Sequence, residues 1–175
     1  MLDSIKAAFP RTEVKACLQT LTDSEFHIYD HETEKRCYVQ VNLEGIKHFT
    51  VKNADKRSVH FLAIDKCLLM DDERTQRCDC AVFDDQTFCF IEIKTTSSMT
   101  QRKKLRREAK NQLKAAINFF RNKVAFDSIQ IEAYVSLLTD LETRPLNRAS
   151  LLEETEEFYE IDVTLFHDNI KQFGP

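Results

Sequence analysis

The sequence contains no tryptophan and only two glycines and three prolines among its 175 residues. So few glycines and prolines argue against a disordered, collagen-like or linker-rich chain. Neither the G-x-G-x-x-G motif nor the P-loop motif occurs, which argues against phosphate binding by a glycine-rich loop. No apolar run reaches the ~18 residues of a membrane span. The first residues lack the apolar segment of a signal peptide, so we expect a cytoplasmic protein without membrane contact.

What the sequence does contain is a large supply of core residues. Thirteen phenylalanines and a length of 175 residues predict one domain over residues 1–175 whose core needs no covalent cross-links. We therefore expect all six cysteines to be reduced thiols. Cys78, Cys80 and Cys89 raise the alternative of a zinc site, but a C-x-C pair with a lone third thiol is more typical of small buried residues.

Charge is distributed unevenly along the chain. The net charge is −4, yet residues 102–123 hold nine Lys or Arg and one Glu, a net of +8. An asymmetry of this kind can direct a positive field toward one face of a protein. The alternative interpretation is a solvated helix that balances acidic neighbours.

Hydrophobic periodicity predicts a mixed α/β architecture. Residues 1–24 favour two short helices divided at Pro10. Alternating segments predict strands, several of them antiparallel, at 25–30, 36–43, 47–53, 58–70 and in a hairpin over 77–96 that closes at Asp84–Thr87. An amphipathic helix capped by Ser98 or Thr100 should then lead to a parallel strand at 128–139, because a helical crossover joins parallel strands. We expect loops at 71–76 and 142–150 and a last strand within 158–169.

The second strand of the 77–96 hairpin carries the most informative side chains. Glu92 and Lys94 share one strand face, and the hairpin brings Asp79 opposite Glu92. Two carboxylates held this close repel each other unless a cation lies between them. Oxygen ligands of this type suit Mg²⁺ or Mn²⁺, and Lys94 could orient or deprotonate a water or offset developing charge. The alternative is a cross-strand salt-bridge cluster without a metal.

Asp79 followed by Glu92-Ile93-Lys94 and then by a helix resembles the PD-(D/E)xK nuclease superfamily. The resemblance implies a restriction-endonuclease-like core of helix, three antiparallel strands, helix and strand, here over about residues 44–139. It implies that Asp79, Glu92 and the carbonyl of Ile93 hold the metal and that Lys94 is the catalytic lysine. Cys78 stands where the motif has proline.

Further residues are weaker candidates in the light of this resemblance. Gln112 occupies the glutamine position of a Gln-x-x-x-Tyr motif, but Ala116 replaces its tyrosine. Asp65 either faces the same cleft or marks the end of a strand. Many members add an acidic residue from the first helix, and the sequence does not select among Glu13, Asp23, Glu25 and Glu44. Residues of the basic helix are expected to contact phosphates, namely Lys103, Lys104, Arg106, Arg107 and Lys110.

The leading expectation is thus a Mg²⁺- or Mn²⁺-dependent nuclease that hydrolyses phosphodiester bonds in DNA, with RNA as another substrate class. Repair, restriction and antiphage defence are all compatible pathways. The alternative is a non-catalytic accessory subunit that uses a degenerate nuclease fold to bind nucleic acid or protein. A protein partner or a homodimer is compatible with both.

Overall fold

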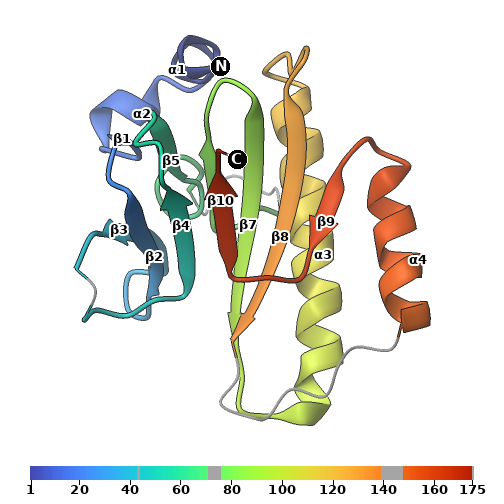
Figure 1. Cartoon of the computed structure of the whole chain (residues 1–175). Coiled ribbons are helices and arrows are strands. Elements are labelled where there is room, and N and C mark those ends of the chain that lie inside the picture. Colours follow the sequence, from blue (N-terminus) through green and yellow to red (C-terminus); the bar gives the residue numbers. More distant parts are fainter. Residues whose placement is uncertain (43, 71–75, 139–147, 175) are drawn as a thin grey trace.

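The chain forms a mixed α/β fold (Figure 1). The computed structural model describes all residues except 43, 71–75, 139–147 and 175. In chain order the elements are α1 (Leu2–Ala8), α2 (Arg11–Val14), β1 (Leu18–Leu21), β2 (Glu25–His31), β3 (Arg36–Gln40), β4 (Phe49–Asn53), β5 (Val59–Ala63), β6 (Cys80–Phe83), β7 (Thr87–Thr95), α3 (Met99–Arg121), β8 (Gln130–Leu138), α4 (Arg148–Tyr159), β9 (Thr164–Phe166) and β10 (Ile170–Phe173).

Two mixed sheets organise these strands. The six-stranded sheet has the order β1-β5-β6-β7-β8-β9, and the four-stranded sheet has the order β10-β4-β2-β3. In the larger sheet β5, β6 and β7 are antiparallel, whereas β8 runs parallel to β7 after the crossover through α3. The expected mixed α/β class, the 77–96 hairpin and the parallel strand that follows the helix are therefore confirmed.

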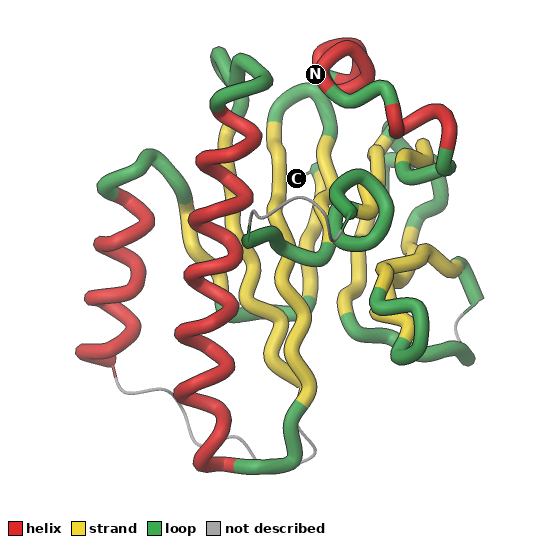
Figure 2. The backbone as a smooth tube through the Cα atoms, turned by 180° about the vertical axis from the view of Figure 1, so that it is seen from behind, coloured by secondary structure: helices red, strands yellow, loops and turns green. Residues whose placement is uncertain are grey.

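The helices and the smaller sheet cover opposite faces of the larger sheet. Viewed from behind, α3 and α4 lie side by side on one face (Figure 2). Phe88 and Phe90 of β7 point to this face, where both contact the ring of Phe120 in α3. On the other face, Tyr134 of β8 packs edge-on against Phe49 of β4 at 5.3 Å between ring centroids. The order of layers is helices, large sheet and small sheet.

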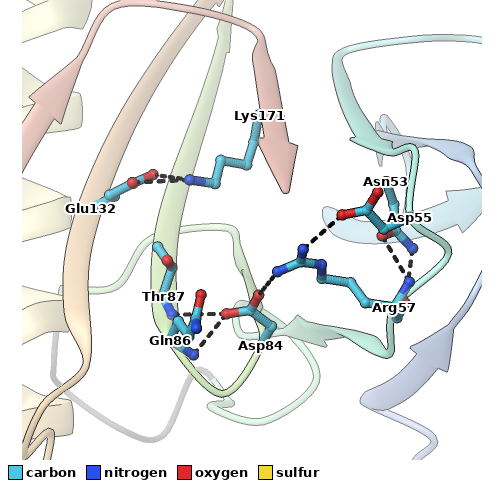
Figure 3. Close-up of polar contacts among 8 residues, drawn as sticks. All are labelled: Asn53, Asp55, Arg57, Asp84, Gln86, Thr87, Glu132 and Lys171. Carbon is cyan, nitrogen blue, oxygen red and sulfur yellow. Dashed lines mark hydrogen bonds and ion pairs between the residues drawn. The ribbon is translucent and has the colours of Figure 1, made fainter. Parts of the chain in front are cut away.

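The last strand joins the two sheets. After β9 completes the edge of the large sheet, β10 pairs in parallel with β4 of the small sheet. Lys171 of β10 donates to both carboxylate oxygens of the buried Glu132 in β8, at 2.9 and 2.8 Å (Figure 3). Nearby, Arg57 lies 3.6 Å from Asp84 in the β6–β7 turn. These polar contacts lie near the closed end of the β6–β7 hairpin. The open end of the hairpin forms a separate region.

The structure corrects the expectation that all cysteines are reduced. Cys17 and Cys67 form a disulfide whose Cα atoms are 5.6 Å apart. The pairing of β1 with β5 brings these distant positions together, because Ala63 N donates to Cys17 O at the end of that ladder. Local sequence patterns do not reveal a register between strands so far apart. The remaining cysteines are free and buried, as expected for small core residues: Cys37, Cys78, Cys80 and Cys89.

Four element predictions also need correction. The strand expected over 58–70 covers only Val59–Ala63, and turns follow it. Leu18–Leu21 is a strand, not the end of a helix. The region 158–169, expected to hold one last strand, contains the end of α4 and the short strand β9, and an additional strand, β10, follows at Ile170–Phe173. The loop expected at 142–150 gives way to α4 from Arg148, and its first part, like most of the loop expected at 71–76, lies outside the described residues. Within the described chain, none of the helices has both the length and the apolar character that a membrane crossing needs.

Candidate functional site

The site is built on the open end of the β6–β7 hairpin. Cys80 pairs with Ile91 in this ladder, so continuing the register by one residue places Asp79 opposite Glu92. Two backbone contacts fix this arrangement: Asp79 N donates to Glu92 Oε2 at 3.1 Å, and Ile93 N donates to Asp79 Oδ2 at 2.6 Å. The hairpin therefore brings the two carboxylates together, as predicted from the sequence.

Glu92 lies fully buried beneath the site, and Lys94 neutralises it. Its side chain is 0% exposed, and its Oε1 lies 2.5 Å from Lys94 Nζ. Burial, followed by repulsion from Asp79, raises the pKa of Glu92 well above its ordinary value. For Lys94, burial lowers the pKa, but attraction to Glu92 and Asp79 outweighs that effect and leaves the pKa raised. Lys94 is consequently a cation at neutral pH and not a proton acceptor.

Asp79 is the carboxylate that reaches the solvent side. It is half-buried, and burial raises its pKa to about 7, although the hydrogen bond from Ile93 N and the charge of Lys94 oppose that shift. With this pKa, the ionised and the protonated form of Asp79 are both populated at neutral pH. An added positive charge near Asp79 would favour the ionised form.

Asp79 and Lys94 open into a cleft of about 770 Å³. Both sheets, the β5–β6 connection and α3 contribute to its wall. It is lined by four carboxylates and three lysines together with neutral side chains, namely Asp30, Glu32, Thr33, Lys35, His48, Asp65, Lys66, Asp79, Ile93, Lys94, Thr95 and Gln112. The predicted residues Asp65, Asp79, Ile93, Lys94 and Gln112 are thus gathered in one place, with Glu92 directly beneath.

The β5–β6 connection is held at the cleft by side chains from both of its ends. Arg77 Nε lies 2.5 Å from Asp65 Oδ1, and Arg77 Nη1 donates to Met70 O at 2.6 Å. Gln112 of α3 donates to Arg77 O at 3.2 Å. Asp65 lines the cleft and lies two residues after the end of β5, so it both faces the cleft and marks the end of a strand. Gln112 positions the backbone two residues before Asp79.

The basic side chains of α3 face a different direction. The five residues expected to contact phosphates line a second pocket of about 430 Å³ against α4, and none of them lines the cleft. Arg106 Nε and Lys110 Nζ lie 3.2 and 3.5 Å from Glu154 Oε1, so acidic residues of α4 neutralise these two cations. Lys103, Lys104 and Arg107 are exposed. The helix borders the cleft through Gln112, not through its basic face.

The additional acidic residues at the cleft are not the ones that sequence reasoning considered. Glu13, Asp23, Glu25 and Glu44 do not line it, whereas Asp30 and Glu32 at the end of β2 do. Burial raises the pKa of Asp30. Sequence reasoning also missed His48, just before β4, which joins them at the cleft. The only sequence signal for Asp30 was a carboxylate that ends an otherwise alternating strand.

The cleft meets part of the requirement for a divalent cation. Among the described residues, no three His, Cys, Asp or Glu side chains lie close enough together to hold a metal ion. Mg²⁺, however, keeps several waters and often takes only one or two carboxylates from the protein. Asp79 and Glu92 provide that pair, and Glu92 Oε1 is a buried acceptor whose neighbour is the ammonium of Lys94. Asp79 and Glu92 are therefore the residues here that could hold a hydrated Mg²⁺ or Mn²⁺.

Comparison with known proteins gives no relative for this chain: no family model, no curated protein and no solved structure matches it.

Proposed function

We propose that this protein is a metal-dependent nuclease that hydrolyses phosphodiester bonds in DNA. The observation that carries the proposal is the reciprocal contact of Asp79 with the Glu92–Ile93 segment, next to a cationic Lys94 at the wall of a cleft. Two strands thereby present two carboxylates and one ammonium within a few residues of each other. This combination is suited to phosphoryl chemistry, in which a metal and a cation offset the charge on oxygen.

The order of elements around the site supports a restriction-endonuclease-like core. Three antiparallel strands, β5 to β7, precede α3 and the parallel strand β8. This is the order that the PD-(D/E)xK resemblance implies. The order of elements differs in one respect, since β1 and the small-sheet strands β2, β3 and β4 separate α1 and α2 from β5.

The residues divide the chemical work as follows. Asp79 and Glu92 would hold the ion, and the Ile93 carbonyl would be the further ligand that the resemblance implies. When bound, Mg²⁺ supplies a polarised phosphoryl oxygen and a water of lowered pKa. Lys94, a cation at the cleft wall, would stabilise charge on the phosphate. Its raised pKa argues against the role of a general base, so a solvent molecule or the substrate accepts the proton of the attacking water.

The exposed cations of α3 supply binding energy outside the cleft. Lys103 and Arg107 are exposed near the helix start, and contacts from such residues to phosphates are salt-dependent and insensitive to base sequence. Arg106 and Lys110, which pair with Glu154, are proposed to contribute less. A duplex that reached both the cleft and these residues would run along the first turns of α3.

A specific observation also favours the second candidate, a non-catalytic nucleic-acid- or protein-binding subunit. The Glu92–Lys94 ion pair already balances the buried carboxylate, so the site satisfies its own charges without a metal. A chain that had lost catalysis would keep this pair for stability alone.

Cleavage assays distinguish the two candidates. The purified protein is incubated with supercoiled DNA, linear DNA and RNA in Mg²⁺, Mn²⁺ or EDTA. We expect cleavage only with metal, and a loss of at least about a hundredfold in Asp79→Asn and in Lys94→Met. Asp127→Asn changes an exposed carboxylate far from the cleft and serves as the matched control. Salt-dependent DNA binding without cleavage under every metal condition would establish the binding subunit instead.

A further inference from the structure

We propose that His48 is a substrate-contacting residue whose Nε2–H donates a hydrogen bond to a phosphate oxygen in the cleft. This inference rests on the proposed function and extends it to a residue outside the Asp-Glu-Lys motif. Three features of the structure support it: an anchored backbone, a defined ring tautomer, and an Nε2–H group at the cleft wall without a partner among the described residues.

The backbone of His48 is anchored to both sheets. Its N–H donates to Ile28 O at 3.0 Å, which extends the β2–β4 ladder by one residue. Its carbonyl accepts a hydrogen bond of 2.9 Å from Ser136 Oγ. Ser136 pairs with Ile93 in the β7–β8 register. His48 is therefore fixed beside the strand segment that carries Glu92, Ile93 and Lys94.

The ring of His48 is held in one tautomer. The backbone N–H of Asp30 donates to His48 Nδ1 at 3.0 Å. A backbone amide can only donate, so Nδ1 must be unprotonated, and the proton of the neutral ring lies on Nε2. Burial lowers the pKa of His48, although Asp30 and Glu32 oppose this shift. Protonation of the ring would break the hydrogen bond from Asp30.

The Nε2–H group is then available to a ligand. His48 lines the cleft together with Asp79 and Lys94, and among the described residues no side chain or carbonyl accepts a hydrogen bond from Nε2. A neutral donor fixed in this way cannot take the proton of a water, because Nε2 already carries one. Its chemistry is that of a hydrogen-bond donor to an anionic oxygen, which suits a phosphodiester and adds no charge to a cleft that already contains three lysines.

Two substitutions separate this role from a structural one. His48→Asn retains an acceptor at the position of Nδ1 for the Asp30 amide but has no group at the position of Nε2. His48→Gln has the opposite properties, with an amide donor near Nε2 and no acceptor near Nδ1. We expect His48→Asn to keep more of the thermal stability but to lose about tenfold or more in single-turnover cleavage of DNA, while His48→Gln stays within about threefold of wild type. If His48 had only a structural role, the variant with the lower thermal stability would also be the variant with the lower cleavage rate.

The outcomes distinguish this inference from the proposed function. If the wild type cleaves DNA and His48→Asn cleaves equally well, the role of His48 is overturned and the nuclease remains. If the wild type cleaves nothing with any metal, the nuclease proposal fails. Imidazole ¹H–¹⁵N spectra then test separately whether His48 contacts a phosphate. A His48 ring in the Nε2–H tautomer whose Nε2 signal moves when a short DNA duplex is added supports the contact. The other tautomer, or an unmoved signal, overturns it.

Discussion

Asp79 takes up its proton far more readily in the folded protein than in the unfolded chain. Burial raises its pKa from 3.8 to about 7, and the difference has a consequence for stability. Between these two values the folded state binds more protons than the unfolded state, so the free energy of unfolding falls as the pH rises. The cost of ionising Asp79 is fully present above about pH 7 and absent below about pH 4.

We predict that Asp79→Asn removes this dependence. Asparagine keeps an acceptor for the Ile93 amide but does not ionise. Raising the pH from 4 to 8 should therefore lower the free energy of unfolding of the wild type by on the order of a few kcal/mol more than that of the variant. Urea unfolding at both values measures the effect, with Asp127→Asn as the control. The addition of Mg²⁺ at pH 8 should stabilise the wild type but not Asp79→Asn. Equal pH slopes in the two proteins would contradict the assignment.

At the scale of elements, α4 is held on α3 by charge as well as by apolar contact. The nearly buried Glu154 lies within 3.5 Å of both Arg106 and Lys110 and 3.0 Å from His167 Nε2. Phe158 of α4 is fully buried one turn later. Acidic residues of α4 therefore balance the part of the basic face at Arg106 and Lys110, whereas Lys103, Lys104 and Arg107 stay exposed.

We predict that Glu154→Gln loosens this helix pair. An amide can accept from one partner but cannot balance two buried cations, so we expect a loss of about 2 kcal/mol in stability. Amide hydrogen exchange should increase in α4 and in the facing half of α3 and remain unchanged in β5–β7. Glu156→Gln, on the exposed side of the same helix, is the matched control. Faster exchange spread evenly over the whole protein would argue against a local role.

The elements that local pattern predicts are those with strong periodicity. The hairpin at Asp84–Thr87 and the amphipathic helix α3 have clear periods and turn residues, and the hairpin alone suffices to bring Asp79, Glu92 and Lys94 together. The helix α4 was missed because glutamates interrupt its apolar spacing. β10 was missed because its four residues acquire a strand partner only from β4, far away in the sequence. Asp30 and His48 meet through another non-local pairing, that of β2 with β4.

At the scale of the whole molecule, one covalent link ties the first strands to the cleft. Cys17 and Cys67, 50 residues apart in sequence, join the start of β1 to the connection that carries Asp65 and Lys66. A loop of this length lowers the entropy of the unfolded chain, and chain-entropy estimates assign about 4 kcal/mol to its closure.

We predict that the double variant Cys17→Ala/Cys67→Ala is less stable than the oxidised wild type by about 2–4 kcal/mol. Denaturant unfolding with and without a dithiol reductant measures the difference. The reductant should destabilise the wild type to a similar extent and leave the double variant unchanged. If the oxidised wild type and the variant unfold at the same denaturant concentration, the link contributes nothing to the fold.

The return of β10 to the small sheet also bears on how the protein is made. Its partner β4 is synthesised about 120 residues earlier, so at ~5–20 residues per second a ribosome needs roughly 6 to 24 s to produce the strand that covers that edge. During this interval the nascent chain exposes an unpaired β4 edge beside a finished β2–β3 hairpin. Chaperone binding to the translating chain should therefore persist until residues 170–173 have emerged.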